Sequence, residues 1–424
     1  MALAPNAPSR AVSSASGGSA TVARSRLTVA SFSYAVLLIC ICLQRFAIPV
    51  GGGLKVSLAT PLVLGLAAWG LSNRMLALDR RRTAFFFGIC AMAAISLVAQ
   101  VSVPVAIAPR MSMPSFAYWL LITSFATLRF REPMDEEAFF RIASFCLTGL
   151  AIAGILQFVL QFVGLRLFEF TGLVPDNLLI EDQFAVVIPF GDGAMLRSNG
   201  FFLIEPSVFS QFMAIGIVVE TLYTRHSRHL LRLGLCFAGL LVSLSGTGWM
   251  VLGSFVIVLA LASGSRGLLS AAILVIGITF AVGIGLLVVP DVTNGILDRT
   301  SEFALPGTSG NERFVTPFMA LNAVLDAAPW TFFTGIGPGA SEQILVPFFY
   351  RLNTPVKILM EYGIGGLFFY LALLLSGSRP RRQWLLLTPL LTLLLIAGGY
   401  HQFSPALFIV LLLGTVATLR PSPA

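Results

Sequence analysis

The stretch of this sequence that is most informative about chemistry runs from Arg197 to Ser210 and contains the step Glu205-Pro206-Ser207. Proline suits the first turn of a helix, because no amide hydrogen bond is lost there. Glu205 is therefore expected at a helix N-terminus, the end that favours negative charge. A carboxylate in that position is either a cap paired with Arg197 or a catalytic group. Its depth favours the catalytic reading, since ionisable groups near hydrocarbon tend to mark substrate paths.

A second informative stretch begins at Arg313 and ends at Glu361-Tyr-Gly363. Between them, the glycines of Gly335-Ile-Gly-Pro-Gly339 allow a tight backbone path with positive φ angles. This glycine set lacks the strand–helix context of a nucleotide-binding loop. Lys357 is expected one turn inside the helix that follows, where it either contacts a ligand or extends its amine outward to water.

The composition indicates a protein that lies within a membrane. Hydrophobic residues make up 57% of the 424 residues and charged residues only 11%, whereas soluble domains carry about 25% charged residues. Apolar stretches of about 20 residues recur, long enough to cross a hydrocarbon core about 30 Å thick. The predicted fold class is all-α, a polytopic integral membrane protein with about 12 transmembrane helices. We expect these helices at residues 27–49, 54–72, 84–106, 111–128, 142–165, 203–223, 230–245, 248–263, 268–289, 356–377, 384–398 and 404–419.

The placement of the basic residues predicts the orientation in the membrane. With the N-terminus inside, the inner segments hold twice as many of the 27 lysines and arginines as the outer segments, as the positive-inside rule requires. The net charge of +8 is thus explained by topology, and nucleic-acid binding is not needed. The five cysteines lie in apolar segments without metal-ligand spacing, and the three histidines do not cluster, so no metal site is expected. The predicted location is a bacterial inner membrane, with both termini in the cytoplasm.

The chain is predicted to form one membrane domain with two long outer loops. Residues 1–25 are rich in alanine and serine and are expected to be a flexible cytoplasmic tail, without the features of a signal peptide. The single transmembrane domain covers residues 26–419, with periplasmic loops at about 164–202 and 290–355, and residues 420–424 form a cytoplasmic tail. Long loops inside compact proteins are usually functional, so the working surface is expected on the outer face.

Several short motifs follow one another in a fixed order: Arg197 with Gly200 and Pro206-Ser207, the turn Ser243-Leu-Ser-Gly-Thr-Gly248, Arg313 with Gly335 to Gly339, and Asn353 with Glu361-Tyr-Gly363. This order, the helix count and the two long loops resemble the O-antigen polymerase and ligase superfamily, and most closely its exopolysaccharide repeat-unit polymerases. The resemblance implies a membrane glycosyltransferase of the GT-C type. Such an enzyme takes a glycan from a polyprenyl (undecaprenyl) diphosphate carrier at the periplasmic face and transfers it to an acceptor sugar. No nucleotide sugar, metal or other cofactor is expected.

Two departures from the family pattern favour a polymerase over a ligase. The family often has an arginine after the serine of the short turn, where this chain has Gly246-Thr247. Ligases typically have a histidine just before the position of Asn353, where this chain has Leu352. His401, in the next outer loop, is a candidate to take the place of that histidine.

The resemblance assigns chemical roles to particular residues. Arg197 and Arg313 are predicted to neutralise the diphosphate leaving group through paired hydrogen bonds, with Arg351 as a third candidate. Glu205 is predicted to accept the proton of the attacking sugar hydroxyl. Direct displacement at the anomeric carbon would invert its configuration. The predicted substrate-binding residues are Arg351, Asn353, Lys357, His401 and Gly337.

Three other classes of protein fit parts of the sequence. An O-antigen ligase would transfer the glycan to lipid A core, a flippase or transporter would move lipid-linked glycans, and a scaffold would use the same residues structurally. A transporter is less favoured, because no internal repeat is visible. The expected partners are a polyprenyl-diphosphate-linked donor and acceptor and membrane lipid, together with a flippase and a chain-length regulator.

Overall fold

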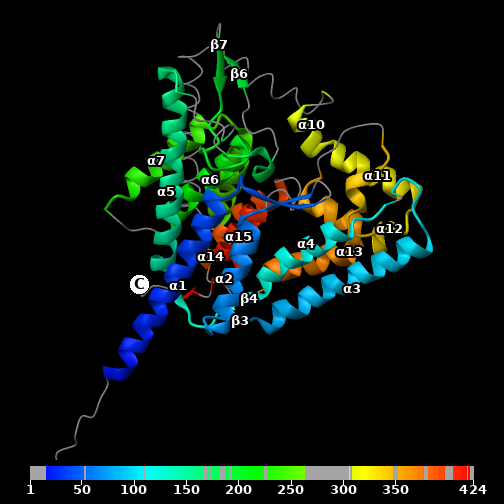
Figure 1. Cartoon of the computed structure of the whole chain (residues 1–424), viewed down its shortest axis with the longest axis horizontal. Helices are drawn as coiled ribbons and strands as arrows, with labels where there is room; N and C mark the ends of the chain where they lie inside the picture. Colours follow the sequence, from blue (N-terminus) through cyan, green and yellow to red (C-terminus); the bar gives the residue numbers. More distant parts are fainter. Residues whose placement is uncertain are drawn as a thin grey trace, which may run out of the picture.

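The computed structural model describes residues 16–51, 54–108, 110–165, 170, 174–180, 187–190, 193–223, 227–262, 305, 308–346, 352–376, 381–396, 404–417 and 419–420. Most of these residues are helical (Figure 1). The helices are α1 Ser16–Cys42, α2 Ala59–Ser72, α3 Arg80–Ser102, α4 Met113–Ser124, α5 Glu136–Leu160, α6 Pro206–Tyr223, α7 His229–Val242, an unlabelled helix Gly246–Ala262, α10 Ser309–Phe314, α11 Thr316–Ala327, α12 Thr331–Thr334, α13 Thr354–Leu375, α14 Arg381–Ile396 and α15 Ser404–Leu411.

The strands of the described chain form short two-stranded pairs between these helices. The pairs are β1 Ala47–Gly51 with β2 Leu54–Ser57, β3 Leu76–Leu78 with β4 Leu128–Phe130, β5 Met134–Asp135 with β8 Leu419–Arg420, and β6 Val187–Phe190 with β7 Gly193–Leu196. The hairpin β6–β7 and α10 lie toward one end of the molecule, whereas β3 and β4 lie at the opposite end (Figure 1).

Each predicted helix overlaps an observed helix, except that 268–289 lies outside the described residues. Four of the observed helices are long and apolar enough to cross a membrane: α3, α5 with the turn that extends it to Val163, α6 and α13. The other apolar helices of the described chain have 10–17 residues. The structure therefore supports a mostly helical protein with membrane-spanning segments, and it supports four spans by length and composition.

Some of the predicted boundaries are wrong. The helix expected at 54–72 begins only at Ala59, because residues 54–57 form β2. The helix expected at 27–49 ends at Cys42, and residues 47–51 form β1 instead. Pro49 has no N–H for a helix and Gly51 begins a glycine run, so this segment favours a hairpin. At its other end, α1 begins at Ser16, within the segment expected to be a tail. The second long loop contains helices, since α10, α11 and α12 all lie between residues 290 and 355.

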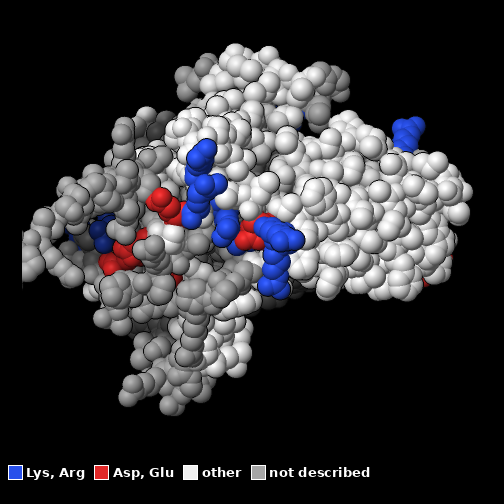
Figure 2. Space-filling view, turned by 90° about the horizontal axis from the view of Figure 1, so that it is seen from below, with Lys and Arg blue, Asp and Glu red and all other residues white. Residues whose placement is uncertain are grey.

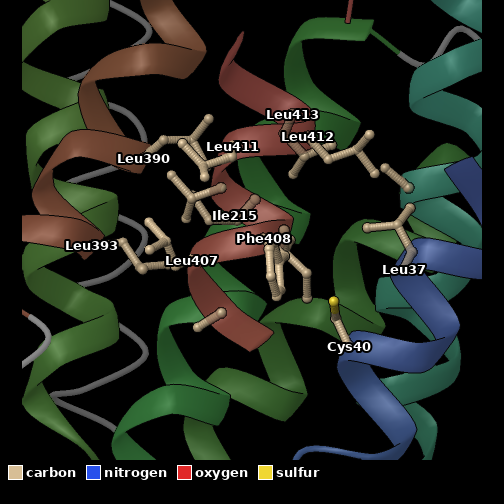
Figure 3. Close-up of a cluster of buried hydrophobic side chains, with 14 of the residues drawn as sticks. Leu37, Cys40, Ile215, Leu390, Leu393, Leu407, Phe408, Leu411, Leu412 and Leu413 are labelled. Carbon is tan, nitrogen blue, oxygen red and sulfur yellow. The ribbon is translucent and has the colours of Figure 1, made fainter. Parts of the chain in front are cut away.

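The helix α15 lies inside the main hydrophobic core, with other helices around it, and not at the surface. Figure 3 shows Leu407, Phe408 and Leu411 of α15 between Leu37 of α1 and Leu390 of α14. Every described side chain from residue 405 to residue 413 is buried. A helix that is apolar on all sides belongs in a protein interior or in a membrane, and α15 occupies the interior.

The helix α13 is interrupted at Gly363, where another segment approaches its backbone closely. Gly363 has φ +67°, so its backbone is not helical, although the helix continues on both sides of it. A Cβ on Gly363 would lie 2.2 Å from the carbonyl oxygen of Phe333, and one on Gly335 would lie 2.2 Å from that of Glu361. The N–H of Ile336 donates to the carbonyl of Met360 at 2.8 Å. The two motifs Gly335 to Gly339 and Glu361-Tyr-Gly363 are thus packed backbone against backbone.

We expect Gly335→Ala to destabilise the protein by more than about 1 kcal/mol, because its positive φ (+79°) disfavours a side chain and a Cβ would meet the backbone of α13. The measurement is the free energy of unfolding of the full chain in detergent. Gly149→Ala is the control, since a Cβ at this position of α5 meets nothing within 4 Å. An equal effect of the two substitutions would contradict the packing argument.

Candidate functional site

The first candidate site is built at the start of α6, where the helix begins with Pro206. Glu205 directly precedes this proline. One of its carboxylate oxygens, Oε2, accepts a hydrogen bond from Ser207 Oγ at 2.7 Å and another from Arg313 Nη2 at 2.9 Å. The side chains of Arg313 and Glu205 are only 14% and 17% exposed. The carboxylate therefore lies in a mostly buried ion pair at the end of a helix whose dipole favours negative charge.

Arg313 reaches this ion pair from a distant part of the sequence, 108 residues from Glu205. It lies on α10, which continues almost directly into α11. Ala320 and Val324 of α11 belong to the same buried cluster as Val356 and Met360 of α13. The position of the guanidinium thus depends on how α11 packs against α13.

The turn Ser243-Leu-Ser-Gly-Thr-Gly248 packs against the first turn of α6. The hydroxyl of Thr247 donates to the carbonyl of Ser207 at 3.1 Å and shares a hydrogen bond with Ser210 Oγ. A Cβ on Gly248 would lie 2.4 Å from the carbonyl oxygen of Ser210, so this position requires a glycine. The turn therefore holds the helix start that carries Glu205.

Arg197 lies next to the same turn. It follows β7, and the N–H of the next residue, Ser198, donates to the carbonyl of Val242 at 3.2 Å. The sequence allowed Glu205 to pair with Arg197, whereas the ion pair described for Glu205 is with Arg313. The structure thus brings Glu205 and Arg313 together and places the backbone of Arg197 beside the turn that supports them.

A buried glutamine of α5 shapes the segment that leads into Glu205. Gln157 Oε1 accepts hydrogen bonds from Ser198 Oγ at 2.8 Å and from the N–H groups of Asn199 and Phe201 at 3.0 and 3.2 Å. Gly200 and Phe201 both have positive φ angles, +69° and +64°. Such a conformation is costly for a phenylalanine, and the hydrogen bonds of Gln157 stabilise it.

Two residues that follow the end of α1, Gln44 and Arg45, were not predicted from the sequence to belong to the site. Gln44 Oε1 accepts a hydrogen bond from the N–H of Ile204 at 3.1 Å, directly before Glu205. Arg45 is 2% exposed, donates to the carbonyl of Phe201 at 3.1 Å and lies over the ring of Phe170. The sequence feature that could have indicated Arg45 is its position next to an apolar segment. A charge there is costly unless it has a function or a partner.

A second polar cluster lies where the glycine motif meets α13. Lys357 forms ion pairs with Glu342 and with Glu361, the latter at 3.9 Å. Its side chain is 3% exposed and that of Glu361 is 1% exposed. Ser341 donates a hydrogen bond to the carboxylate of Glu361, and Ser96 donates one to its backbone carbonyl. Lys357 therefore does not extend to water, and the cluster stabilises the interrupted part of α13.

The other predicted substrate-binding residues are positioned differently from one another. Asn353 caps α13, where its Oδ1 accepts a hydrogen bond from the N–H of Val356 at 3.1 Å. Gly337 is buried, and its N–H donates to Ser96 Oγ at 2.9 Å. Both groups are occupied within the protein, which favours structural roles. Arg351 and His401 lie outside the described residues.

The arrangement at the start of α6 combines a proton acceptor with cations. A carboxylate can accept a proton from a hydroxyl, and guanidinium groups bind phosphate oxygens. Glu205 and Arg313 provide these two functions within one contact. The carboxylate of this site can therefore accept a proton, while the guanidinium stabilises a bound group whose negative charge increases during a reaction.

Comparison with known proteins does not place this chain in a family. No protein-family model matches it, and no curated protein matches it. The resemblance to the O-antigen polymerase and ligase superfamily therefore stays a prediction.

The ion pair of Glu205 and Arg313 should contribute to stability as a mostly buried pair. A double-mutant cycle with Glu205→Gln and Arg313→Gln is expected to give a coupling free energy of about 1.5–3 kcal/mol, because the hydrogen bond joins two charged groups. The free energy of unfolding in detergent is the measurement. The exposed pair Glu137 and Arg141 of α5, joined at 3.1 Å, is the matched control and should give about 0.3–0.5 kcal/mol. Equal couplings would show that burial does not strengthen the Glu205 pair.

Removing the buried amine of Lys357 should be strongly destabilising. We expect Lys357→Met to lower the free energy of unfolding by about 3–5 kcal/mol, because the carboxylate of Glu361 is then buried without its cation. The double variant Lys357→Met, Glu361→Gln should recover a large part of this loss. Wild-type stability of Lys357→Met would rule out the ion pair as the element that stabilises the interrupted part of α13.

Proposed function

We propose that this protein is a glycosyltransferase of a bacterial inner membrane that polymerises polyprenyl-diphosphate-linked oligosaccharide repeat units at the periplasmic face, for exopolysaccharide synthesis. The observation that carries the proposal is the ion pair of Glu205 and Arg313 at the start of α6. It joins a proton acceptor to a phosphate-binding cation at the end of a candidate membrane span. A lipid-linked diphosphate donor requires both groups at such a boundary.

The surface of the helices supports a membrane setting. Large apolar side chains are exposed along candidate spans, for example Phe87 and Val98 of α3 and Phe145 and Val159 of α5. Exposed apolar surface of this extent is typical of contact with lipid or with another protein. The elements β6–β7 and α10 lie at one end and β3–β4 at the other (Figure 1), which agrees with a two-sided protein whose outer loops lie together. The proposed topology has both termini in the cytoplasm.

The proposed reaction is a direct displacement. A hydroxyl oxygen of the acceptor glycan attacks the anomeric carbon of the donor while the bond from that carbon to the diphosphate oxygen breaks. The hydroxyl proton passes to Glu205, and the diphosphate leaves with the bonding electron pair. Arg313 and Arg197 balance its charge through hydrogen bonds to phosphate oxygens. The configuration at the anomeric carbon is inverted.

The ion pair suggests an order of events at the site. Before the donor binds, Arg313 occupies Oε2 of Glu205. A diphosphate carries more negative charge than a carboxylate and therefore competes for the guanidinium. Transfer of Arg313 to the donor makes the carboxylate oxygen available to the acceptor hydroxyl. Binding of the correct donor would thus prepare the base.

A purified preparation of the full chain should elongate polyprenyl-diphosphate-linked repeat units from its own organism into a ladder of products on a gel. Glu205→Gln should reduce the rate by about 100-fold or more, since positioned proton transfer contributes about 10²–10⁴. Arg313→Ala and Arg197→Ala should also abolish the ladder while the proteins stay folded. Glu137→Gln on α5 is the control, because it removes a carboxylate that pairs with Arg141 away from the site.

The same assay separates the other classes. Elongation only when lipid A core is supplied as the acceptor would indicate a ligase. Movement of the lipid-linked glycan across a liposome membrane without any ladder would indicate a transporter. A ladder of wild-type intensity from Glu205→Gln would remove Glu205 from the proposed mechanism.

A further inference from the structure

The end of the molecule opposite α10 carries a group of exposed arginines that the proposed reaction does not use. We call this group the basic patch, and it consists of Arg74, Arg80, Arg81, Arg129 and Arg131. All five side chains are exposed. No carboxylate of the described chain forms an ion pair with any of them. Two described carboxylates lie next to these arginines in the sequence, Asp79 and Glu132. The patch therefore has an excess of positive charge, with five arginines against two carboxylates.

The β3–β4 ribbon brings these arginines together from distant parts of the sequence. In its antiparallel register Ala77 is opposite Arg129, and the N–H of Arg131 donates to the carbonyl of Met75 at 2.9 Å. Arg129 lies on β4 and Arg131 directly follows the end of this strand at Phe130. Both side chains are exposed, whereas that of Phe130 between them is buried, so the two arginines lie on the same side of the ribbon. Arg74 directly precedes Met75.

The remaining arginines of the patch follow the ribbon directly. Arg80 and Arg81 begin α3 two residues after β3 ends at Leu78. The ribbon is closed at this point, because the N–H of Asp79 donates to the carbonyl of Thr127 at 2.8 Å. All five arginines thus surround one small ribbon.

Several arginines of the basic patch occupy positions that are energetically unfavourable for them. Arg74 has φ +58° and occupies the residue after the C-cap of α2, where glycine is usual. Arg80 and Arg81 lie in the first turn of α3, and a helix N-terminus disfavours cations. The carboxylate of the N-cap residue Asp79 accepts hydrogen bonds from the N–H groups of Arg81 and Arg82, so it is already engaged with the backbone of this turn. Like charges on one ribbon face also repel. A negatively charged partner would offset all three costs.

The residues around the basic patch indicate which kind of anion it binds. Trp69, Leu78 and Phe87 are exposed beside it, and tryptophan is enriched where membrane meets water. Figure 2 views this end of the molecule and shows basic side chains with acidic ones among them, beside a wide surface that has few charges. A soluble anion would need the cations alone. Arginines at the border of an apolar surface fit a headgroup whose acyl chains cover that surface.

We propose that the basic patch binds the headgroups of acidic phospholipids in the adjacent membrane leaflet. The phosphate groups of these lipids accept hydrogen bonds from Arg74, Arg129 and Arg131, and their acyl chains lie along α2 and α3. This lipid contact anchors the end of the protein opposite the Glu205 site. It does not depend on the glycan chemistry proposed above.

The test is binding of phosphatidylglycerol and phosphatidylcholine to the purified full chain in detergent, measured by native mass spectrometry. Wild type should bind phosphatidylglycerol more tightly, with a preference that weakens as salt is raised. Each arginine near an acidic surface contributes about fivefold in affinity, so Arg129→Gln, Arg131→Gln should bind phosphatidylglycerol about 25-fold more weakly. Arg74→Asn should lose about fivefold, and asparagine tolerates the positive φ angle, so this variant stays folded.

Arg141→Gln is the matched control, because Arg141 is an exposed arginine that already pairs with Glu137, and it should bind phosphatidylglycerol like wild type. Equal binding of the two lipids by wild type would overturn the proposal. So would an equal loss in the control and the patch variants, or competition by inorganic phosphate as effective as that by phosphatidylglycerol. Loss of polymerisation in Glu205→Gln with intact lipid preference would leave this inference standing, so the two proposals fail independently.

Discussion

A polar group inside an apolar helical protein must find its partner within the protein, since neither lipid nor a packed core can provide one. This constraint accounts for the arrangement of the described chain. Several of its buried charges and amides lie near helix ends or at the interruption of α13, because free backbone groups occur there. Gln157, the pair of Glu205 and Arg313, and the cluster around Lys357 all follow this rule.

The short motifs of the sequence separate in space into two groups. The segment around Glu205, the turn 243–248 and Arg313 meet at the start of α6. The glycines 335–339 and the residues 361–363 meet at the interruption of α13. The helix α11 connects the two, because it follows Arg313 in the chain and packs against α13. The second group therefore acts on the first by positioning α11, which follows the short helix α10 that carries Arg313.

The two ends of the molecule differ in whether their charged side chains form ion pairs. At the end with α10, the described acidic and basic side chains pair closely, and the pair at Glu205 is mostly buried. At the end with β3 and β4, the five arginines of the basic patch are exposed and form no ion pair with a described carboxylate, although Arg81 lies over the ring of Phe85. Paired charges suit a site that redistributes hydrogen bonds during a reaction, whereas unpaired surface charges suit attachment to an anionic surface.

The sequence alone determined the apolar helical character of the protein and the approximate positions of its helices, because the length and hydropathy of a segment are local properties. It also indicated Glu205, since a Glu-Pro step marks a helix start. Tertiary structure decided that Arg313 pairs with Glu205, because this contact joins residues 108 apart in the sequence and depends on how α11 packs against α13. It likewise decided that Lys357 is buried against Glu342, because the segment that carries Glu342 reaches α13 through backbone contacts at Gly335 and Gly363 that no local pattern encodes. The other partner, Glu361, lies one turn further along the same helix.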